Sequence, residues 1–177
     1  MTFTELWYYP QGLEALERHY RTTVGLPGMV VEVGAWEGRS TCHLANVAYP
    51  TVVHAVDTWD GSPGEISAEL AQERDVYATF VANVETLTAG NVVPYRMGWR
   101  EWFATHDGPI RFLHIDATHT YAEVRANIEA ALPHVVVGGI ICGDDAHHEP
   151  VISAARDALG PVTIDASLWV WEKTDGI

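Results

Sequence analysis

The residues Val30-Val-Glu-Val-Gly-Ala-Trp-Glu-Gly-Arg-Ser40 decide the fold of this chain. They begin as an apolar run that contains Glu32, continue through a turn with Gly34 and Gly38, and end at the polar start of a helix. A strand that leads into a glycine turn and a helix N-terminus builds a pocket for a nucleotide-like cofactor. The segment therefore predicts an α/β fold with a cofactor site beside this strand.

The spacing of the glycines indicates which kind of cofactor fits. A dinucleotide site needs G-x-G-x-x-G, because its second glycine lets the backbone approach a pyrophosphate closely. Here Gly34 and Gly38 are four residues apart, and Trp36 stands where the second glycine would be. The pattern favours a cofactor without a pyrophosphate, and an ordinary strand–helix turn is the alternative.

The composition excludes several classes of protein. The chain has 177 residues, of which 47% are hydrophobic and 19% charged, as in a single globular domain. A formal net charge of −14 argues against nucleic acid or an anionic membrane as a partner, since both require a basic surface. No apolar run reaches membrane-spanning length, and residues 1–5 do not resemble a signal peptide. We therefore expect a cytoplasmic protein whose two cysteines are buried free thiols.

Strand and helix signals alternate along the chain. We expect helices at 11–23, 39–48, 66–88 (in one or two pieces), 99–105, 120–132 and 150–159. Strands are expected at 29–33, 52–56, 92–96 and 111–115, within 135–142, where a Gly-Gly turn leads into a buried strand, and twice within 161–171. This order predicts a Rossmann-like, doubly wound, seven-stranded and mostly parallel sheet, with helices on both faces and a C-terminal antiparallel hairpin. Residues 1–28 would form a helical segment before the main domain, 29–177.

Acidic residues recur where the predicted strands end. Asp57 ends the second strand, Asp116 the fourth, and Asp144 and Asp145 follow the fifth. Ligands of open α/β sheets bind at this edge, where Asp57 could accept hydrogen bonds from the ribose of an adenosine cofactor. The three later acids could hold a hard divalent cation such as Mg²⁺ or Mn²⁺. The alternatives are helix capping by Asp116, a transition-metal site that uses histidine, or no metal.

The motif E-x-G-x-x-x-G, together with the order of elements over 29–173, resembles the class I S-adenosylmethionine-dependent methyltransferases. The stretch Asp116-Ala-Thr-His-Thr-Tyr121, the later acidic pair and Asp57-Thr-Trp-Asp-Gly-Ser62 resemble the metal-dependent macrocin-type sugar O-methyltransferases and the related group named cephalosporin hydroxylases. The catechol O-methyltransferases are more distantly similar. Fewer residues precede the first strand here than in these relatives, so the resemblance leaves the acceptor open.

The resemblance implies a role for individual residues. His119 matches the general base, and Asp116, Asp144 and Asp145 match the metal ligands. S-adenosylmethionine is the implied cofactor, held at the strand ends and the first helix, with Trp59 and Trp99 as candidates to stack on the adenine. The residues expected to bind it are Glu32, Gly34, Ala35, Trp36, Gly38, Ser40, Asp57, Trp59, Gly98, Trp99 and Asp116.

The implied reaction is methyl transfer to a hydroxyl of a small molecule, either a sugar unit or a catechol-like diol. Leu6-Trp-Tyr-Tyr-Pro10 and Trp102 are candidates for a lid or an acceptor wall, and the first could instead form a contact in a homo-oligomer. Two other functions remain open. One is a metal-dependent hydroxylase or other oxidoreductase, and the other is a non-catalytic S-adenosylmethionine-binding partner subunit.

Overall fold

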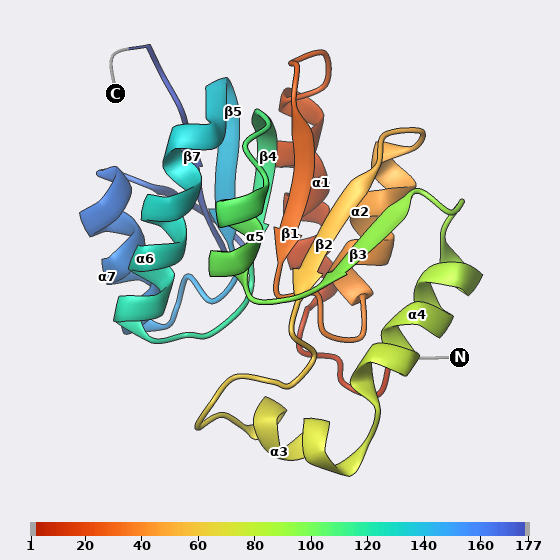
Figure 1. Ribbon diagram of the computed structural model, residues 1–177. Coiled ribbons are helices and arrows are strands. Elements are labelled where there is room, and N and C mark those ends of the chain that lie inside the picture. The colour runs from red at the N-terminus through yellow and green to blue at the C-terminus, as the bar shows by residue number, and fades with distance from the viewer. Residues whose placement is uncertain (1–2, 176–177) are drawn as a thin grey trace.

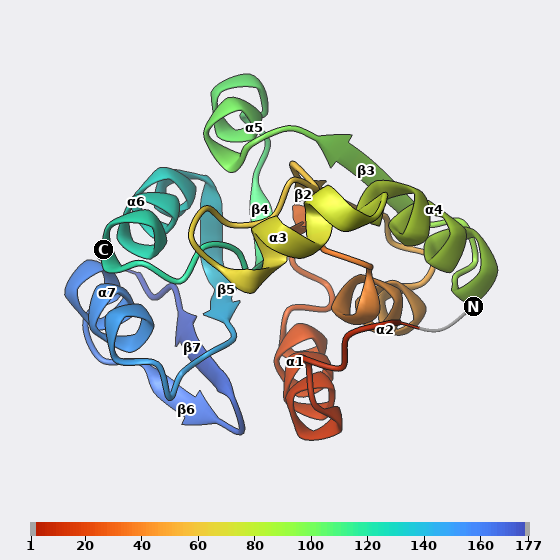
Figure 2. The same cartoon turned by 90° about the horizontal axis from the view of Figure 1, so that it is seen from below.

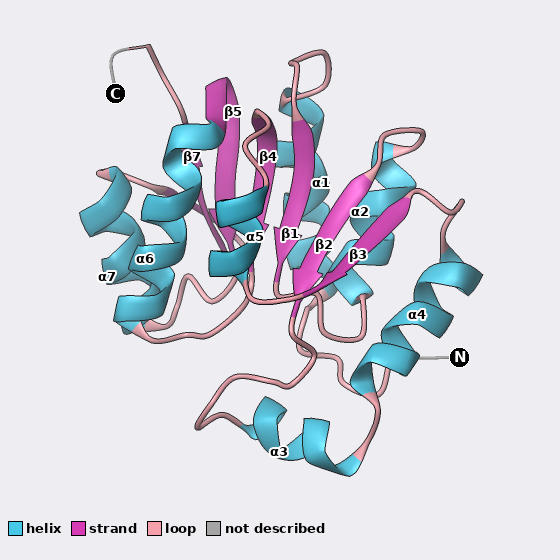
Figure 3. Cartoon of the chain, viewed as in Figure 1, coloured by secondary structure: helices cyan, strands magenta, loops and turns pink. Residues whose placement is uncertain are grey.

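The computed structural model describes residues 3–175 and contains one seven-stranded sheet (Figures 1 and 3). The strand order is β3-β2-β1-β4-β5-β7-β6. The strands are β1 (Met29–Val33), β2 (Val53–Asp57), β3 (Val92–Arg96), β4 (Ile110–Ile115), β5 (Val135–Gly143), β6 (Thr163–Asp165) and β7 (Leu168–Glu172). All neighbouring pairs from β3 to β5 are parallel, whereas β7 runs antiparallel to both β5 and β6. The predicted sheet and its terminal hairpin are confirmed.

Helices cover both faces of the sheet (Figures 1 and 2). They are α1 (Pro10–Thr22), α2 (Arg39–Ala48), α3 (Ile66–Glu73), α4 (Val76–Leu87), α5 (Trp99–Thr105), α6 (Tyr121–Ala131) and α7 (Glu149–Leu159). One core cluster joins α1 and α2 to the sheet, a second joins α5, α6 and α7 to its other face, and a third packs α4 against α2. No helix within residues 3–175 is long and apolar enough to cross a membrane.

The apolar pattern of the strands explains their places in the sheet. All six residues of β4 are buried, as befits a strand covered on both faces, whereas β3 lies at the edge and is largely exposed. Pro94 in β3 fits this edge position, because proline cannot donate a hydrogen bond to a further strand. The predicted helix over 66–88 is divided at Arg74, and the Asp75 side chain caps the second piece by accepting from the backbone N of Ala78.

The structure corrects the expectation of a Gly-Gly turn before β5. Gly138 and Gly139 lie within a continuous strand, and Gly138 has a φ of +78°. The pairing with β4 shifts here, from Ile110 opposite Val135 to Phe112 opposite Ile140. The glycines therefore form a bulge, in which extra residues are accommodated without ending the strand.

Candidate functional site

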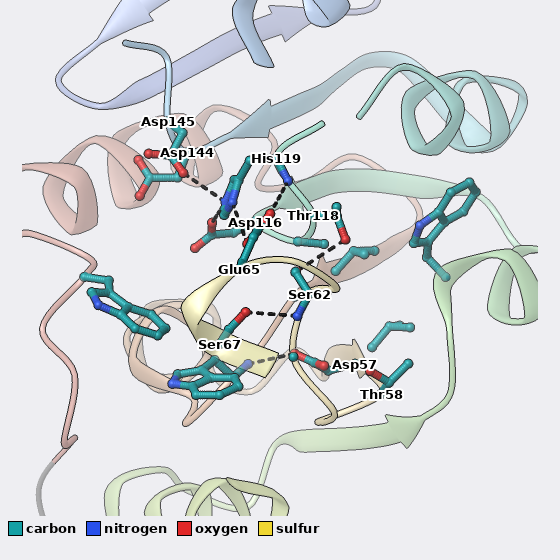
Figure 4. A pocket seen from close by; sticks show the side chains of 18 of the residues that line it. Asp57, Thr58, Ser62, Glu65, Ser67, Asp116, Thr118, His119, Asp144 and Asp145 are labelled. Atoms are coloured by element: carbon teal, nitrogen blue, oxygen red, sulfur yellow. Dashed lines mark hydrogen bonds and ion pairs between the residues drawn. The ribbon is translucent and has the colours of Figure 1, made fainter. Parts of the chain in front are cut away.

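A cavity of about 620 Å³ lies at the carboxyl ends of the central parallel strands. Its walls come from the turns after β1, β2, β4 and β5, from the loop before α5, and from the N-terminal residues Trp7 and Tyr9. The helix α3 lies across these strand ends (Figure 2). Figure 4 shows Asp57 on one side of the cavity and His119 with its acidic neighbours on the other.

Gly34 provides the close approach of two strand ends that the cavity requires. It has a φ of +92°, and a Cβ atom built on it would lie 1.9 Å from the backbone O of Asp116. Only glycine fits between these two turns, because any side chain would overlap the main chain of the β4 end. The motif glycine thereby brings Asp116 next to the end of β1.

Asp57 ties the turns after β1 and β2 together. Its Oδ2 accepts a hydrogen bond from the backbone N of Trp36 at 2.9 Å, and its Oδ1 accepts one from the backbone N of Trp59 at 2.7 Å. Burial raises the pKa of Asp57, and these backbone donors lower it in part. Each oxygen keeps further acceptor capacity, so the side chain can also face a ligand in the cavity.

Only part of the predicted cofactor set lines the cavity. The lining residues among them are Gly34, Trp36, Asp57, Gly98, Trp99 and Asp116. Ala35, Gly38 and Ser40 are buried behind the turn, and Glu32 is fully buried in the sheet. Trp59 is 3% exposed, packs on Tyr77 and Phe80, and donates from Nε1 to the backbone O of Trp36. Its position in the core corrects the expectation that it stacks on a cofactor.

Asp116, His119 and Asp145 converge on the opposite side of the cavity. One potential ligand atom from each lies within 4.8 Å of the other two. Nε2 of His119 lies 2.9 Å from Oδ2 of Asp145 and 3.7 Å from Oδ1 of Asp116 (Figure 4). Thr120 caps α6 by accepting from the backbone N of Glu123, so Asp116 is not needed as the helix cap.

The carboxylates of this group perturb one another and the imidazole. Burial by itself lowers the pKa of His119, but Asp116 and Asp145 outweigh it and raise this pKa to about 11. His119 in turn lowers the pKa of Asp145. Burial and the nearby Asp116 carboxylate raise the pKa of Asp144 to about 6, and Asp144 Oδ1 is buried without a hydrogen-bond partner. The group thus has unsatisfied negative charge, which suits a cation.

Glu65, which the sequence did not single out, holds His119 in place. Its Oε1 accepts from the backbone N of His119 at 3.1 Å, and its Oε2 lies 3.0 Å from Nδ1. Glu65 directly precedes α3 and is 54 residues away along the chain. No local motif marks it, since only the path of the chain over the strand ends brings it to His119.

The N-terminal segment is fastened across the turn after β1. The backbone N of Thr4 donates to Oε2 of the buried Glu37 at 2.7 Å, and the rings of Trp7 and Trp36 lie 5.5 Å apart. Trp7 and Tyr9 face the cavity, as expected of an acceptor wall. Trp102 does not, because it is on the side of α5 that packs into the core, where it is fully buried and stacked on His106. The structure therefore corrects its expected place on that wall.

A buried polar chain lies behind the cavity and connects β1, α2, β4 and the N-terminal segment. Glu32 accepts a hydrogen bond from Thr41 Oγ1, and its Oε1 lies 3.0 Å from Nδ1 of His114. Nε2 of His114 is 3.2 Å from the hydroxyl of Tyr8. Glu32 therefore joins β1 to β4 and the N-terminal segment, and it does not line the cavity.

Comparisons with known proteins agree with this geometry. Residues 31–146 match a family model described as a methyltransferase domain. Two similar structures are those of the O-methyltransferase NovP (21% identity, TM-score 0.70) and CalS11, a TDP-rhamnose 3′-O-methyltransferase of calicheamicin biosynthesis (20% identity, TM-score 0.63). The alignments cover 93% of this chain and 80% of NovP, and 90% of this chain and 78% of CalS11. At this identity they show a shared fold.

Curated protein sequences gave no match. The family model nevertheless spans well over half of the chain, including the glycine turn, Asp57 and the group around His119. The sheet places β7 between β5 and β6, and the similar O-methyltransferase structures share the overall fold. The chain therefore belongs to the methyltransferase-domain family and is a class I, S-adenosylmethionine-dependent methyltransferase.

Proposed function

We propose that this enzyme transfers the methyl group of S-adenosylmethionine to a hydroxyl of a small molecule, with the aid of a divalent cation. The observation that carries the proposal is one cavity with two chemically different sides. One side has the glycine turn and Asp57, and the other has His119 among carboxylates. The cavity, about 620 Å³, has room for a cofactor and a small acceptor together.

The first side supplies the contacts that an adenosine cofactor needs. Asp57 would accept from the ribose hydroxyls, while its bonds to the backbone of Trp36 and Trp59 keep it fixed. Trp99, which lines the cavity from the start of α5, provides the flat face for the adenine. Gly34 and Asp116 both line the cavity where the turns after β1 and β4 meet, and the methionine part would lie against them.

The second side would hold the cation through carboxylate oxygens. Asp116 and Asp145 already converge, and Asp144 offers an oxygen that lacks a partner. Oxygen ligands favour Mg²⁺ or Mn²⁺. Such a cation, when bound, lowers the pKa of an acceptor hydroxyl and orients it.

His119 would receive the proton of the acceptor hydroxyl. Glu65 fixes its ring through Nδ1, and Nε2 lies 2.9 Å from Oδ2 of Asp145. Asp116 and Asp145 hold a proton on this ring, so His119 becomes a base only when these carboxylates have another positive partner. The arrangement therefore couples the base to the cation site.

Binding and turnover measurements test the proposal separately. S-adenosylhomocysteine should bind in calorimetry, Asp57→Ala should abolish that binding, and methyl transfer to a panel of polyols and catechols should stop on addition of EDTA. Turnover that survives EDTA would refute the metal role. Binding without any turnover, with or without metal, would instead support a non-catalytic partner subunit.

One observation supports a second candidate. Because His119 belongs to the converging group, the site could hold a transition metal through an imidazole and two carboxylates, as a hydroxylase would require. Such an enzyme would need Fe²⁺ and O₂ and would not consume S-adenosylmethionine. Product analysis under nitrogen with Mg²⁺ distinguishes the two candidates. A methylated product supports the methyltransferase, because methyl transfer is independent of O₂.

A further inference from the structure

We infer that the acceptor is a neutral or amine-bearing diol on an apolar body, and that diols carrying a phosphate or carboxylate are rejected. The inference rests on the proposed function, because it concerns the part of the cavity that the cofactor leaves free. The inference follows from four observations: the acidic side chains of the cavity wall, the ion pairs of Arg74 and Arg100, the acids at four helix N-termini, and the apolar rim.

The cavity wall is acidic without a permanent cation. Its carboxylates are Asp57, Glu65, Asp116, Asp144 and Asp145, and no lysine or arginine lines it within residues 3–175. A sulfonium and a divalent cation bring three positive charges, and a protonated His119 brings a fourth. These positive charges are fewer than the carboxylates of the wall. An acceptor that carries an anion would therefore find no uncompensated positive charge in the cavity.

Two guanidinium groups that lie over rings of the cavity wall, Arg74 over Trp36 and Arg100 over Trp99, are already paired with carboxylates. Arg74 lies 3.3 Å from Glu5 and 3.2 Å from the buried Glu37. Arg100 makes two hydrogen bonds of 2.8 Å to Glu123. Recruiting either arginine to an anion would leave its carboxylate partner uncompensated, and for Glu37 that carboxylate is buried.

Four helices that begin beside the cavity have an acidic side chain in their first turn. The acids are Glu69 in α3, Glu101 in α5, Glu123 in α6 and Glu149 in α7. The helices α1 and α2, which also begin beside the cavity, have no acid in their first turn. The four acids already interact with the positive end of each helix dipole. A phosphate would therefore be repelled at these four helix N-termini, which would otherwise attract it.

The rim of the cavity is apolar on the side of the N-terminal segment. Trp7 and Tyr9 line it and remain largely exposed, and Ile66 at the start of α3 is exposed beside the same cavity. Exposed aromatic faces of this kind bind apolar rings and sugar faces. The wall thus combines an apolar rim with a deep acidic floor, which fits an uncharged or cationic acceptor.

A series of catechols that differ only in side-chain charge tests the inference. Dopamine carries an ammonium and dihydrocaffeate a carboxylate, each separated from the ring by two carbons, and ethylcatechol has an uncharged ethyl group there. The acidity of the ring hydroxyls is therefore nearly constant across the series. We expect kcat/KM for dihydrocaffeate to be at least about tenfold below that for ethylcatechol. The kcat/KM for dopamine should equal or exceed that for ethylcatechol, and any difference between the two should shrink at high salt.

A variant at the rim provides an independent measurement. His147 lines the cavity with a side chain that is 78% exposed, so His147→Lys places a permanent cation there without disturbing the core. The ratio of dihydrocaffeate to ethylcatechol turnover should rise several-fold, while His147→Gln should leave it near the original value. A ratio that does not respond to His147→Lys contradicts the charge argument.

The outcomes separate the inference from the proposed function. Efficient methylation of dihydrocaffeate overturns the inference and leaves the methyltransferase activity intact. If no catechol is methylated, equilibrium dialysis of the three probes against protein loaded with S-adenosylhomocysteine and Mg²⁺ still ranks them. Equal or tighter binding of dihydrocaffeate would overturn the inference there too.

Discussion

The Glu65 carboxylate contacts both the backbone and the ring of His119. Its Oε1 lies 3.1 Å from the backbone N of His119, and its Oε2 lies 3.0 Å from Nδ1. The two residues belong to different layers of the molecule, since Glu65 precedes the crossing helix α3 and His119 follows β4. Two contacts of this kind fix the position of the loop and the rotation of the imidazole together. Glu65 therefore acts as a positioning residue for His119.

Glu65→Gln should lower kcat by about tenfold or more, because the amide cannot keep both contacts and the ring loses its carboxylate partner. S-adenosylhomocysteine affinity should stay unchanged, as should the melting temperature within a few degrees. The pH–rate profile should also shift, which a merely structural role would not cause. Glu69→Gln, at an exposed position of the adjoining helix α3, is the matched control. Equal loss of kcat in both variants would exclude the positioning role.

Asp57→Asn should weaken the binding of S-adenosylhomocysteine by roughly tenfold to a hundredfold, because a carboxylate oxygen that accepts hydrogen bonds is replaced by a donor. The same change leaves one of the backbone N–H groups of Trp36 and Trp59 without its acceptor, so the free energy of unfolding should fall by about 1–3 kcal/mol. Calorimetry and urea unfolding measure the two effects. Asp60→Asn, three residues away and exposed, should change neither.

The fold could be predicted from the sequence because its signals are local and periodic. The glycine turn after β1, the apolar β4 and the acids at the strand ends all lie next to the strands they mark. The same is true of the short connection that makes β6 and β7 a hairpin. The bulge at Gly138 was missed, since a glycine pair marks a turn and a bulge equally well.

The candidate site could be predicted only in part, because several of its contacts join distant segments. Asp116 and His119 share one loop and were found together. Glu65 and Glu37 contact residues far away in the sequence, and nothing near them marks that contact. Trp59 and Trp36 follow strand ends in the same way, yet only Trp36 faces the cavity, because packing decides which aromatic ring is buried.

Gly34→Ala should abolish S-adenosylhomocysteine binding and lower the free energy of unfolding by more than about 2 kcal/mol, because the new Cβ overlaps the backbone of Asp116. Gly64→Ala separates this clash from backbone strain. Gly64 also has a positive φ, of +82°, but a Cβ atom added there would meet nothing within 4 Å. Gly64→Ala should lower the free energy of unfolding by only about 1 kcal/mol and leave S-adenosylhomocysteine binding intact. Thermal unfolding and calorimetry compare the two, and equal losses would mean that strain alone explains Gly34.

The buried pair of Glu32 and His114 should make the protein less stable as the pH rises. Burial by itself lowers the pKa of His114, but Glu32 outweighs it, and the net effect is a raised pKa. The folded state thus binds a proton that the unfolded chain releases near pH 6.5. The pair's contribution is complete below that pH and is lost as the pH rises through the folded-state pKa, by at most about 1.4 kcal/mol per pH unit.

Urea unfolding at several values between about pH 6 and pH 9 measures this loss. His114→Gln should be destabilised by about 3–5 kcal/mol at the acidic end, because it leaves Glu32 buried without a positive partner. The double variant Glu32→Gln/His114→Gln removes both charges, so it should recover part of that stability and lose the pH dependence in this range. A slope that persists in the double variant would assign the pH dependence to other groups. A slope that disappears ties the pH dependence to the Glu32–His114 ion pair, which joins β1 to β4 behind the cavity.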